Sequence, residues 1–381
     1  MIRDTNIKVD RERCIACGIC VDRCVMDNLR LSVAPCRQAC PLHINCQESI
    51  KLIAQGKEQQ AIASLGEFLP FMGILRLLCH APCEKACARK KVDKPVHIRA
   101  LHGYLAGSDS KYIDGSSQQV AAESSGKKVA ICGSGPAALM AAWRLGRSDH
   151  HIVMFESKKE PGGALRDYDP MSDNYSQTIR ELIEAIKDSG TDLKTGVEAP
   201  AFKKLFNLYD GVIITYKDEN ELSSILGQND VDKESFQTDP RTLQVVGQNK
   251  MFVCKDLGSS RSRLINALAA GKTASESAHR FLSDVPLMWE RDFWEAKGNV
   301  KAYAPAYETA KHVQQQDNAL EQREDDTGLK FDTKEAAAFE AERCLGCGRP
   351  FDQNQTCWYC LPCELDCPTN AIEVRIPYLL R

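Results

Sequence analysis

Residues 127–145 read KKVAICGSGPAALMAAWRL and decide the fold of the middle of this 381-residue chain. They predict a β-strand, a glycine turn and a helix, with Gly133-x-Gly135-x-x-Ala138 at the turn. Glycine at such a turn lets the backbone approach a pyrophosphate closely and presents the helix N-terminus to it. The stretch therefore predicts the first unit of a dinucleotide-binding, Rossmann-type domain of the α/β class.

A second predicted strand supports this interpretation, because a lone glycine pattern is weak evidence. Residues 151–157 (HIVMFES) carry Glu156 about twenty residues after the turn, where an acidic side chain binds a ribose hydroxyl. The candidate cofactor contacts in these two segments are Gly133, Ser134, Gly135, Pro136, Ala137 and Glu156.

Most of the 18 cysteines lie in two terminal groups, residues 14–87 and 344–367. Only Cys132 and Cys254 lie between them, on predicted strands, where small core residues are expected.

No signal peptide and no run of about 18 apolar residues occurs, so we expect a cytoplasmic protein without a membrane span. The net charge of −3 and the lack of a basic, aromatic-interleaved run argue against nucleic acid. In a reducing compartment, tightly spaced cysteines favour metal ligation over disulfides.

The spacing C-x2-C-x2-C-x3-C, in which three thiolates reach one [4Fe–4S] cubane and the fourth turns to a neighbour, occurs twice. It is formed by Cys14, Cys17, Cys20 and Cys24 at one end and by Cys357, Cys360, Cys363 and Cys367, with Pro368, at the other. Zinc is the alternative, although zinc sites rarely use three consecutive cysteine steps. Two such halves make a two-cluster ferredoxin with crossed fourth ligands, so we interpret the chain ends as a split ferredoxin. The crossed sets are Cys14, Cys17, Cys20 with Cys367, and Cys357, Cys360, Cys363 with Cys24.

Residues 34–105 resemble the N-terminal iron–sulfur domain of the glutamate synthase small subunit and of dihydropyrimidine dehydrogenase. The resemblance rests on APCRQACP (34–41) and CHAPCEKACARKKVDKPVHIRAL (79–101), separated by a helical segment. It implies a cluster held by Cys40, Cys79, Cys83 and Cys87. The R-C-L-x-C sequence of the family's other cluster stands here at 343–347, so we expect that cluster to use Cys36, Cys46, Cys344 and Cys347. Four clusters then use all 16 remaining cysteines, and three clusters are the alternative, because family members sometimes leave cysteines unused.

The same resemblance extends over the middle of the chain. Pro161-Gly162-Gly163 and residues 229–282 resemble the FAD-binding pattern of the glutamate synthase small subunit, with Asp256 at its conserved aspartate position. The resemblance implies FAD as cofactor and adds Gly162, Gly163 and Asp256 to the candidate contacts. Lys255 replaces a glycine of the pattern, and a Rossmann domain that has lost its cofactor is the alternative.

The family's inserted NADPH-binding domain has no counterpart in this sequence. The family strand that precedes it ends in Ala-Thr-Gly, whereas here residues 209–220 carry Thr215-Tyr216-Lys217, and the pattern resumes near Asp230. About a dozen residues cannot form a βαβ unit, which needs roughly 30. No second glycine fingerprint occurs, so we expect no NAD(P)H site in this chain.

The sequence thus predicts an α/β FAD-binding domain, an α-helical iron–sulfur domain and ferredoxin-like segments. Their boundaries are an N-terminal ferredoxin-like segment (1–33), a helical [4Fe–4S] domain (34–105), a linker (106–126), the FAD-binding domain (127–283), a connecting segment (284–340) and a C-terminal ferredoxin-like segment (341–381).

The expected function is that of an electron-transfer subunit, relaying electrons through several [4Fe–4S] clusters and one FAD between partner redox subunits of an anaerobic complex. Candidate partners are a hydrogenase, a formate or aldehyde oxidoreductase, a bifurcating complex, and ferredoxin. No acid–base or nucleophilic constellation stands out, so no catalytic residue is assigned. The alternatives are an NAD(P)H-dependent iron–sulfur flavin oxidoreductase and a scaffold whose clusters serve assembly. Trp358 and Tyr359 are expected to shield a cluster from water.

Overall fold

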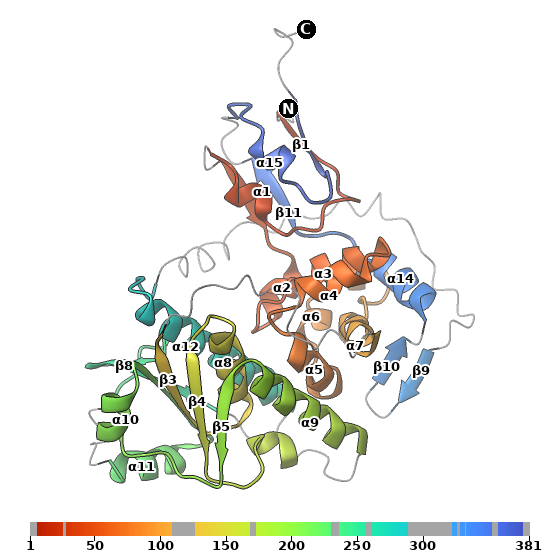
Figure 1. Ribbon diagram of the computed structural model, residues 1–381. Coiled ribbons are helices and arrows are strands. Elements are labelled where there is room, and N and C mark those ends of the chain that lie inside the picture. Colours follow the sequence, from red (N-terminus) through yellow and green to blue (C-terminus); the bar gives the residue numbers. More distant parts are fainter. Residues whose placement is uncertain are drawn as a thin grey trace. The chain divides into compact units, whose positions relative to one another are not determined.

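Figure 1 shows the computed structural model of the chain, which forms two compact units. The structure describes residues 6–25, 28–108, 126–167, 173–229, 236–256, 261–288, 322–325, 328–331, 333–352 and 357–375. Unit 1 comprises Met1–Leu69, Ala81–Ser108 and Phe293–Arg381, and unit 2 comprises Pro70–His80 and Asp109–Asp292. Much of the predicted linker (106–126) and connecting segment (284–340) lies outside the described residues.

Unit 2 is built on a six-stranded sheet with the order β5-β4-β3-β6-β8-β7. Its strands are β3 (Lys128–Cys132), β4 (His151–Glu156), β5 (Thr191–Thr195), β6 (Gly211–Tyr216), β7 (Gln244–Val245) and β8 (Gln248–Lys255). All neighbours are parallel except β7, which runs antiparallel to β8. Because β3 pairs with β4 on one side and β6 on the other, the order reverses at β3, where open α/β sheets bind ligands. The predicted Rossmann-type fold is confirmed.

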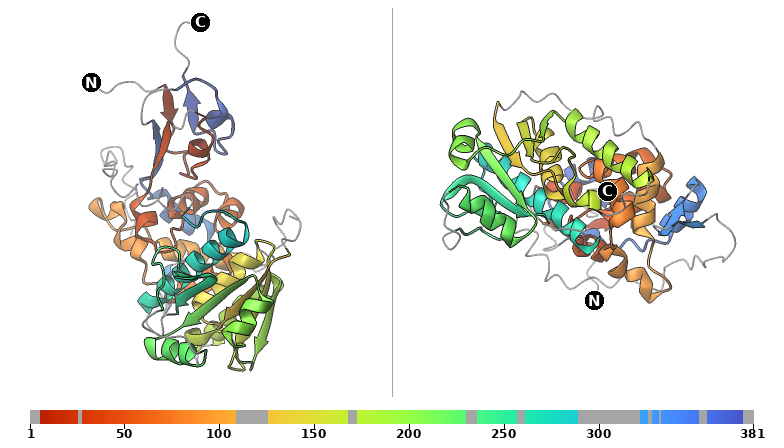
Figure 2. Two further views of the ribbon diagram at one scale, coloured as in Figure 1. Left: turned by 90° about the vertical axis from the view of Figure 1, so that its left-hand side faces the viewer. Right: turned by 90° about the horizontal axis from the view of Figure 1, so that it is seen from below.

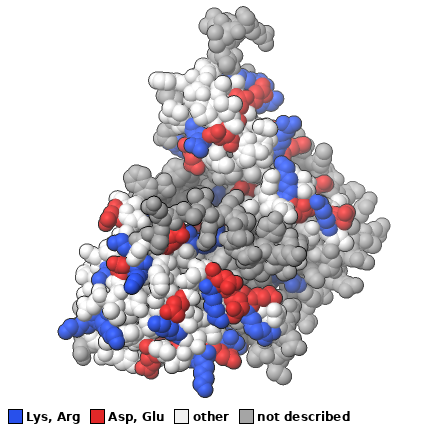
Figure 3. Space-filling model, in the orientation of Figure 1, with Lys and Arg blue, Asp and Glu red and all other residues white. Residues whose placement is uncertain are grey.

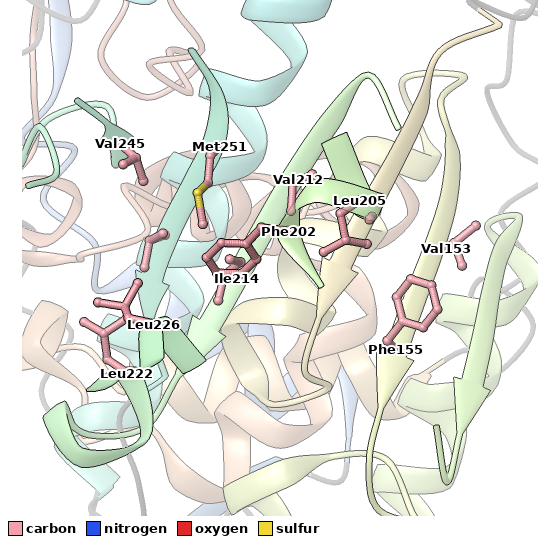
Figure 4. Packing of buried hydrophobic residues seen from close by; sticks show 12 residues of the cluster. Val153, Phe155, Phe202, Leu205, Val212, Ile214, Leu222, Leu226, Val245 and Met251 are labelled. Carbon is pink, nitrogen blue, oxygen red and sulfur yellow. The ribbon is translucent and has the colours of Figure 1, made fainter. Parts of the chain in front are cut away.

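Helices cover both faces of this sheet (Figure 1). On one face α8 (Pro136–Gly146) packs against α12 (Arg261–Leu282). Gly271 permits their close approach, because a Cβ there would lie 2.1 Å from the carbonyl oxygen of Ala137. The helix α9 (Asp173–Asp188) contacts α8, β5 and α5 (Met72–Leu78). On the other face, α10 (Phe202–Leu208) and α11 (Glu219–Gly227) bury apolar side chains against the strands; Figure 4 labels Phe202, Leu205, Leu222 and Leu226 among them.

The ferredoxin-like part of unit 1 is made from both ends of the chain. β1 (Ile7–Val9) pairs antiparallel with β12 (Ile372–Val374), and β2 (Leu29–Ser32) pairs antiparallel with β11 (Arg349–Asp352). The two views of Figure 2 agree with Figure 1 in showing these terminal segments side by side. The short helices α1 (Ile19–Asp22) and α15 (Pro362–Leu365) complete it around a small apolar core that includes Cys20 and Cys363.

The helical part of unit 1 surrounds α3 (Cys46–Ala54), which contacts α2, α4, α7 and α14. The other elements are α2 (Pro35–Ala39), α4 (Glu58–Ser64), α6 (Pro82–Lys85), the 3-10 helix η2 (Ala88–Lys91), α7 (Ile98–Ser108), the hairpin β9 (Gln322–Asp325) and β10 (Gly328–Phe331), and α14 (Lys334–Glu342). α2, α6 and α15 each begin with Pro-Cys, since proline suits the first helical position. This start places Cys36, Cys83 and Cys363 in the first turns of their helices.

None of the helices in these described ranges is long and apolar enough to cross a bilayer. Acidic and basic side chains alternate over the face shown in Figure 3, without a large field of one sign among its described residues. Such a mixed surface lacks the electrostatic footprint of a nucleic-acid-binding face.

Candidate iron–sulfur and flavin sites

The ferredoxin-like part of unit 1 brings eight thiols into two groups of four. Group A consists of Cys24, Cys357, Cys360 and Cys363, and group B consists of Cys14, Cys17, Cys20 and Cys367. In group A, Cys363 interacts electrostatically with the other three thiols, and in group B every pair interacts. The pairing of β1 with β12 is the cause, because it brings the end of the chain beside the first motif. These are the crossed sets expected from the sequence, and their ligation of clusters stays a prediction.

Burial sets the protonation of these thiols. It raises the pKa of Cys14, Cys17 and Cys20 above the ordinary thiol value, and it raises the pKa of Cys363 to about 11, with neighbouring thiols adding to the shift. The thiols are therefore protonated at neutral pH until iron replaces the proton, and cluster assembly must release protons. Four adjacent thiols are a donor set that fits a [4Fe–4S] cluster.

A third group lies in the helical part of unit 1 and lines one buried pocket. Group C consists of Cys36, Cys87, Cys344 and Cys347. Every pair of these thiols interacts electrostatically. Burial is again the largest influence and raises the pKa of Cys344 to about 11 and that of Cys347 to about 12.

Group C differs from the expected sets by one exchange. The expected set contained Cys46 in place of Cys87, but Cys46 does not line the pocket, and its thiol interacts electrostatically with those of Cys36 and Cys83. The resemblance placed Cys83 and Cys87 on one cluster. In the structure Cys83 lies in the first turn of the four-residue helix α6, whereas Cys87 lies beyond its end, beside Cys344. The thiols of Cys83 and Cys87 still interact electrostatically, so their assignment to different groups stays a prediction.

The remaining thiols of unit 1 form group D, which consists of Cys40, Cys46 and Cys83. Cys83 interacts electrostatically with Cys40 and with Cys46. Cys46 begins α3 and is 1% exposed; the neighbouring thiols of Cys36 and Cys83, together with burial, raise its pKa. Cys79 is buried at the end of α5 in unit 2, where its amide donates to the carbonyl of Leu75, and its role as a ligand stays a prediction.

A buried ionic network fixes the R-C-L-G-C segment within unit 1. Arg343 is fully buried and donates to both carboxylate oxygens of Glu340 (2.7 and 2.9 Å), to Asp93 (3.0 Å) and to the carbonyl of Lys94 (2.5 Å). Arg89 donates to Asp93 and to the carbonyl of Arg343 (3.1 Å). The residue that precedes Cys344 is thus tied to the segment that follows Cys87, and this tie positions two thiols of group C.

The two aromatic residues expected to shield a cluster differ in their surroundings. Tyr359 packs on the ferredoxin-like core, and its hydroxyl accepts a hydrogen bond from Asn6 (2.8 Å). Trp358 is 72% exposed, and Cys360 is exposed as well. The expectation is therefore wrong for Trp358: the small core takes only one of these consecutive side chains. Group A is the thiol group that reaches the surface of unit 1.

Within the described part of the chain, no three Cys, His, Asp or Glu side chains close on the position of a single metal ion. A zinc ion holds its sulfur ligands at about 2.3 Å, whereas a cubane spreads four thiolates around four iron atoms. The looser thiol groups are compatible with the larger of these two sites.

Unit 2 contains a cavity of about 600 Å³ at the carboxyl end of its parallel strands. It is lined by the glycine turn after β3, the end of β4, the loop after β5, the end of β6, and α11. Six of the nine candidate cofactor residues line it, namely Gly133, Ser134, Gly135, Glu156, Gly163 and Asp256. The other three, Pro136, Ala137 and Gly162, are buried beside it. The volume lies within the range of ordinary cofactor sites.

Backbone amides and two carboxylates form one side of this cavity. Ser134 donates to Glu156 (2.5 Å) and accepts from the amide of Gly162 (3.0 Å), which holds the acidic side chain at the end of β4. The amide of Ala137, at the start of α8, donates to Asp256 (3.4 Å). A helix N-terminus with an acidic residue at the end of the next strand fits the pyrophosphate and ribose of a dinucleotide.

Gly135 and Asp256 are in tight contact. A Cβ at Gly135 would lie 1.6 Å from a carboxylate oxygen of Asp256. Burial, with smaller contributions from Glu221 and Glu156, raises the pKa of Asp256 to about 7. Near neutral pH this carboxyl group therefore carries a proton part of the time, which reduces its repulsion of a diphosphate.

Several residues of the cavity were not among the candidates. Cys132 lines it, although the sequence suggested only a core role, and burial raises its pKa to about 12. Tyr216 and Lys217 also line it. The sequence singled them out because they replace a family motif, and that departure was the signal that could have marked them as contacts.

Comparisons with known proteins agree with both sites. Residues 1–112 match the family model described as dihydropyrimidine dehydrogenase domain II, 4Fe-4S cluster, and residues 131–180 match that of the NAD(P)-binding Rossmann-like domain. The chain is 28% identical over 213 residues to the glutamate synthase [NADPH] small chain of Mycobacterium tuberculosis. The chain is thus similar to the iron–sulfur flavoproteins of this family. It binds [4Fe–4S] clusters and FAD.

Two other relatives of this iron–sulfur flavoprotein are subunits of redox enzymes. One is the NADP(+)-dependent formate dehydrogenase subunit beta of Moorella thermoacetica, 30% identical over 205 residues. The other is the NADPH-Fe(3+) oxidoreductase subunit beta of Geobacter sulfurreducens, 28% identical over 163 residues. The matches cover 48%, 55% and 42% of this chain but only 29%, 40% and 24% of the formate dehydrogenase, glutamate synthase and iron reductase chains.

The grouping of the thiols predicts which double variants lose one cluster and which lose two. Cys87→Ala with Cys344→Ala should lose about four iron atoms per chain, because both thiols belong to one cluster. Cys46→Ala with Cys344→Ala should lose about eight. Iron and sulfide are measured on anaerobically purified protein, and Cys254→Ala, a buried thiol outside the groups, should lose none. The reverse pattern would restore the expected sets.

Proposed function

We propose that this iron–sulfur flavoprotein is an electron-transfer subunit that relays electrons between partner redox proteins and has no nicotinamide site of its own. Clusters exchange single electrons, and a flavin exchanges one or two. The chain supplies the thiols that hold these groups, the order in which they follow one another, and the surface at which a partner docks.

The observation that carries the proposal is that the thiol groups of unit 1 follow one another in a line. Cys20 of group B interacts with Cys363 of group A. Cys36 of group C interacts with Cys46 of group D, and Cys87 of group C interacts with Cys83 of group D. Groups B and C meet at α3, where Lys51 interacts with a thiol of each. The order A, B, C, D begins at the exposed group and leads inward, as a relay requires.

The path of the chain after β6 supports the lack of a nicotinamide domain. In the described residues of this connection, β6 leads directly into α11, which begins at Glu219 and is capped by Asp218 accepting from the amides of Asn220 and Glu221. The same helix lines the cavity. A short helix thus follows the strand after which the family inserts its second dinucleotide domain.

The names of the relatives favour a second candidate, an NAD(P)H-dependent oxidoreductase. Two of them carry NADPH and one carries NADP(+) in their names. An NAD(P)H-dependent oxidoreductase needs a nicotinamide site over the flavin. This chain would have to form that site without the inserted domain.

Kinetics with NADPH separate the two candidates. We expect the purified chain to reduce viologen from NADPH at a rate that rises linearly with NADPH and does not saturate, because no pocket binds the nicotinamide. The same preparation should pass electrons between dithionite and a one-electron acceptor. Saturation at micromolar NADPH would establish the oxidoreductase instead. Activity that appears only with an added partner subunit would locate the nicotinamide site on that partner.

A further inference from the structure

The segments that carry groups B and C meet at one point of α3. Gly346 lies between Cys344 and Cys347 of group C, and a Cβ there would lie 3.7 Å from the carbonyl oxygen of Arg11, in the segment that leads to Cys14. The same Cβ would lie 3.5 Å from the Cε of Lys51. The stem of this lysine therefore packs on the loop that holds group C, beside the segment that holds group B.

Gln47, one turn before Lys51, fixes this arrangement. Its side chain accepts a hydrogen bond from the amide of Gly348 (2.5 Å) and donates to the carbonyl of the same residue (2.7 Å). A side-chain amide that pairs with both backbone groups of one residue fixes the register of that residue. The R-C-L-G-C loop is thus held against α3, with Lys51 on the side toward group B.

The ammonium group of Lys51 influences thiols on both sides. Burial raises the pKa of Cys14 and of Cys344, and Lys51 opposes that shift at each of them. Two other charges act on one side only in these interactions: Glu48 on Cys17 of group B, and Arg37 on Cys36 of group C.

We propose that Lys51 is a positioning residue that raises the reduction potentials of the clusters held by groups B and C and lowers the electrostatic cost of placing these two anionic centres side by side. The inference rests on the proposed function to the extent that these groups must hold clusters. Reduction adds a negative charge to a cluster, so a cation beside it favours the reduced form. A cation between two clusters acts on both.

The test is a redox titration followed by electron paramagnetic resonance on the whole protein. Signals of the two clusters are assigned from Cys14→Ala and Cys344→Ala, each of which should remove one. We expect Lys51→Met to lower the reduced-to-oxidised ratio of both clusters about tenfold at a fixed potential, equivalent to about 59 mV for one electron. The signals of groups A and D should move less. Lys51→Arg keeps the charge and should restore both ratios, and Lys57→Met, a lysine of the same unit, is the control.

The outcomes are distinguishable from those of the proposed function. If the wild-type clusters titrate and Lys51→Met changes neither assigned signal, this inference is overturned while the relay stands. If no cluster of the wild type can be reduced, the relay itself fails. Iron content must match the wild type; if both Lys51→Met and Lys51→Gln lose iron, the lysine is needed for folding and the proposal is overturned.

Discussion

Gly135→Ala is expected to abolish FAD retention during purification. The new methyl carbon would lie 1.6 Å from one carboxylate oxygen of Asp256 and 2.5 Å from its Cγ. Either the carboxylate or the start of α8 must move, and both lie at the cavity where we expect the pyrophosphate and ribose to bind. Forcing an extra carbon into a packed site costs about 1–3 kcal/mol, and about 1.4 kcal/mol is a tenfold change in Kd. The Kd for FAD should therefore rise by about ten- to a hundredfold.

Released FAD is measured by its fluorescence after acid treatment and compared with iron in the same sample. Iron should stay at the wild-type value, because the thiol groups of unit 1 are separate from this contact. Gly227→Ala is the matched control: this glycine lies on α11 beside the same cavity, and a Cβ there meets nothing within 4 Å. Full FAD occupancy in Gly135→Ala would show that the cofactor binds elsewhere. Loss of FAD in Gly227→Ala as well would point to general instability of unit 2.

Arg343→Met is expected to unfold the surroundings of group C and to remove its cluster. The substitution leaves the carboxylate of Glu340 buried without its cation and removes one partner of Asp93. Removing one partner of a buried ion pair costs about 3–5 kcal/mol. Arg89 and Arg343 together hold the pKa of Asp93 at about 2. The substitution therefore lowers the free energy of unfolding most above that pH, where the carboxylate is charged.

The measurements are iron content and urea unfolding followed by circular dichroism. We expect the loss of about four iron atoms per chain and a clear fall in the unfolding midpoint of unit 1. Arg375→Met is the control, because this arginine pairs with Glu373 on the surface, where ion pairs contribute about 0–1 kcal/mol. Wild-type iron and stability in Arg343→Met would show that the network does not hold the R-C-L-G-C segment.

The sequence by itself determined the short motifs that bind cofactors in this protein. The glycine turn at 133–135 and the acidic end of the next strand predicted the Rossmann-type fold, because phosphate binding there depends on a few adjacent residues. The spacing C-x2-C-x2-C-x3-C predicted clusters for the same reason, since three of its four thiolates are close neighbours along the chain. The replacement of Ala-Thr-Gly by Thr215-Tyr216-Lys217 marked the strand after which we propose that the nicotinamide domain is missing.

The tertiary structure decided which thiols share a group. The pairing of β1 with β12 brings Cys367 to the thiols of group B, which lie at the other end of the chain. The contacts of Arg343 bring Cys344 beside Cys87, which is also distant in the sequence. We predict that Cys83 and Cys87 serve different clusters because α6 ends between them, although their thiols interact. Spacing constrains only neighbours along the chain. The partners of a thiol depend on where short helices end and on which distant segments pack together, and those are properties of the folded chain alone.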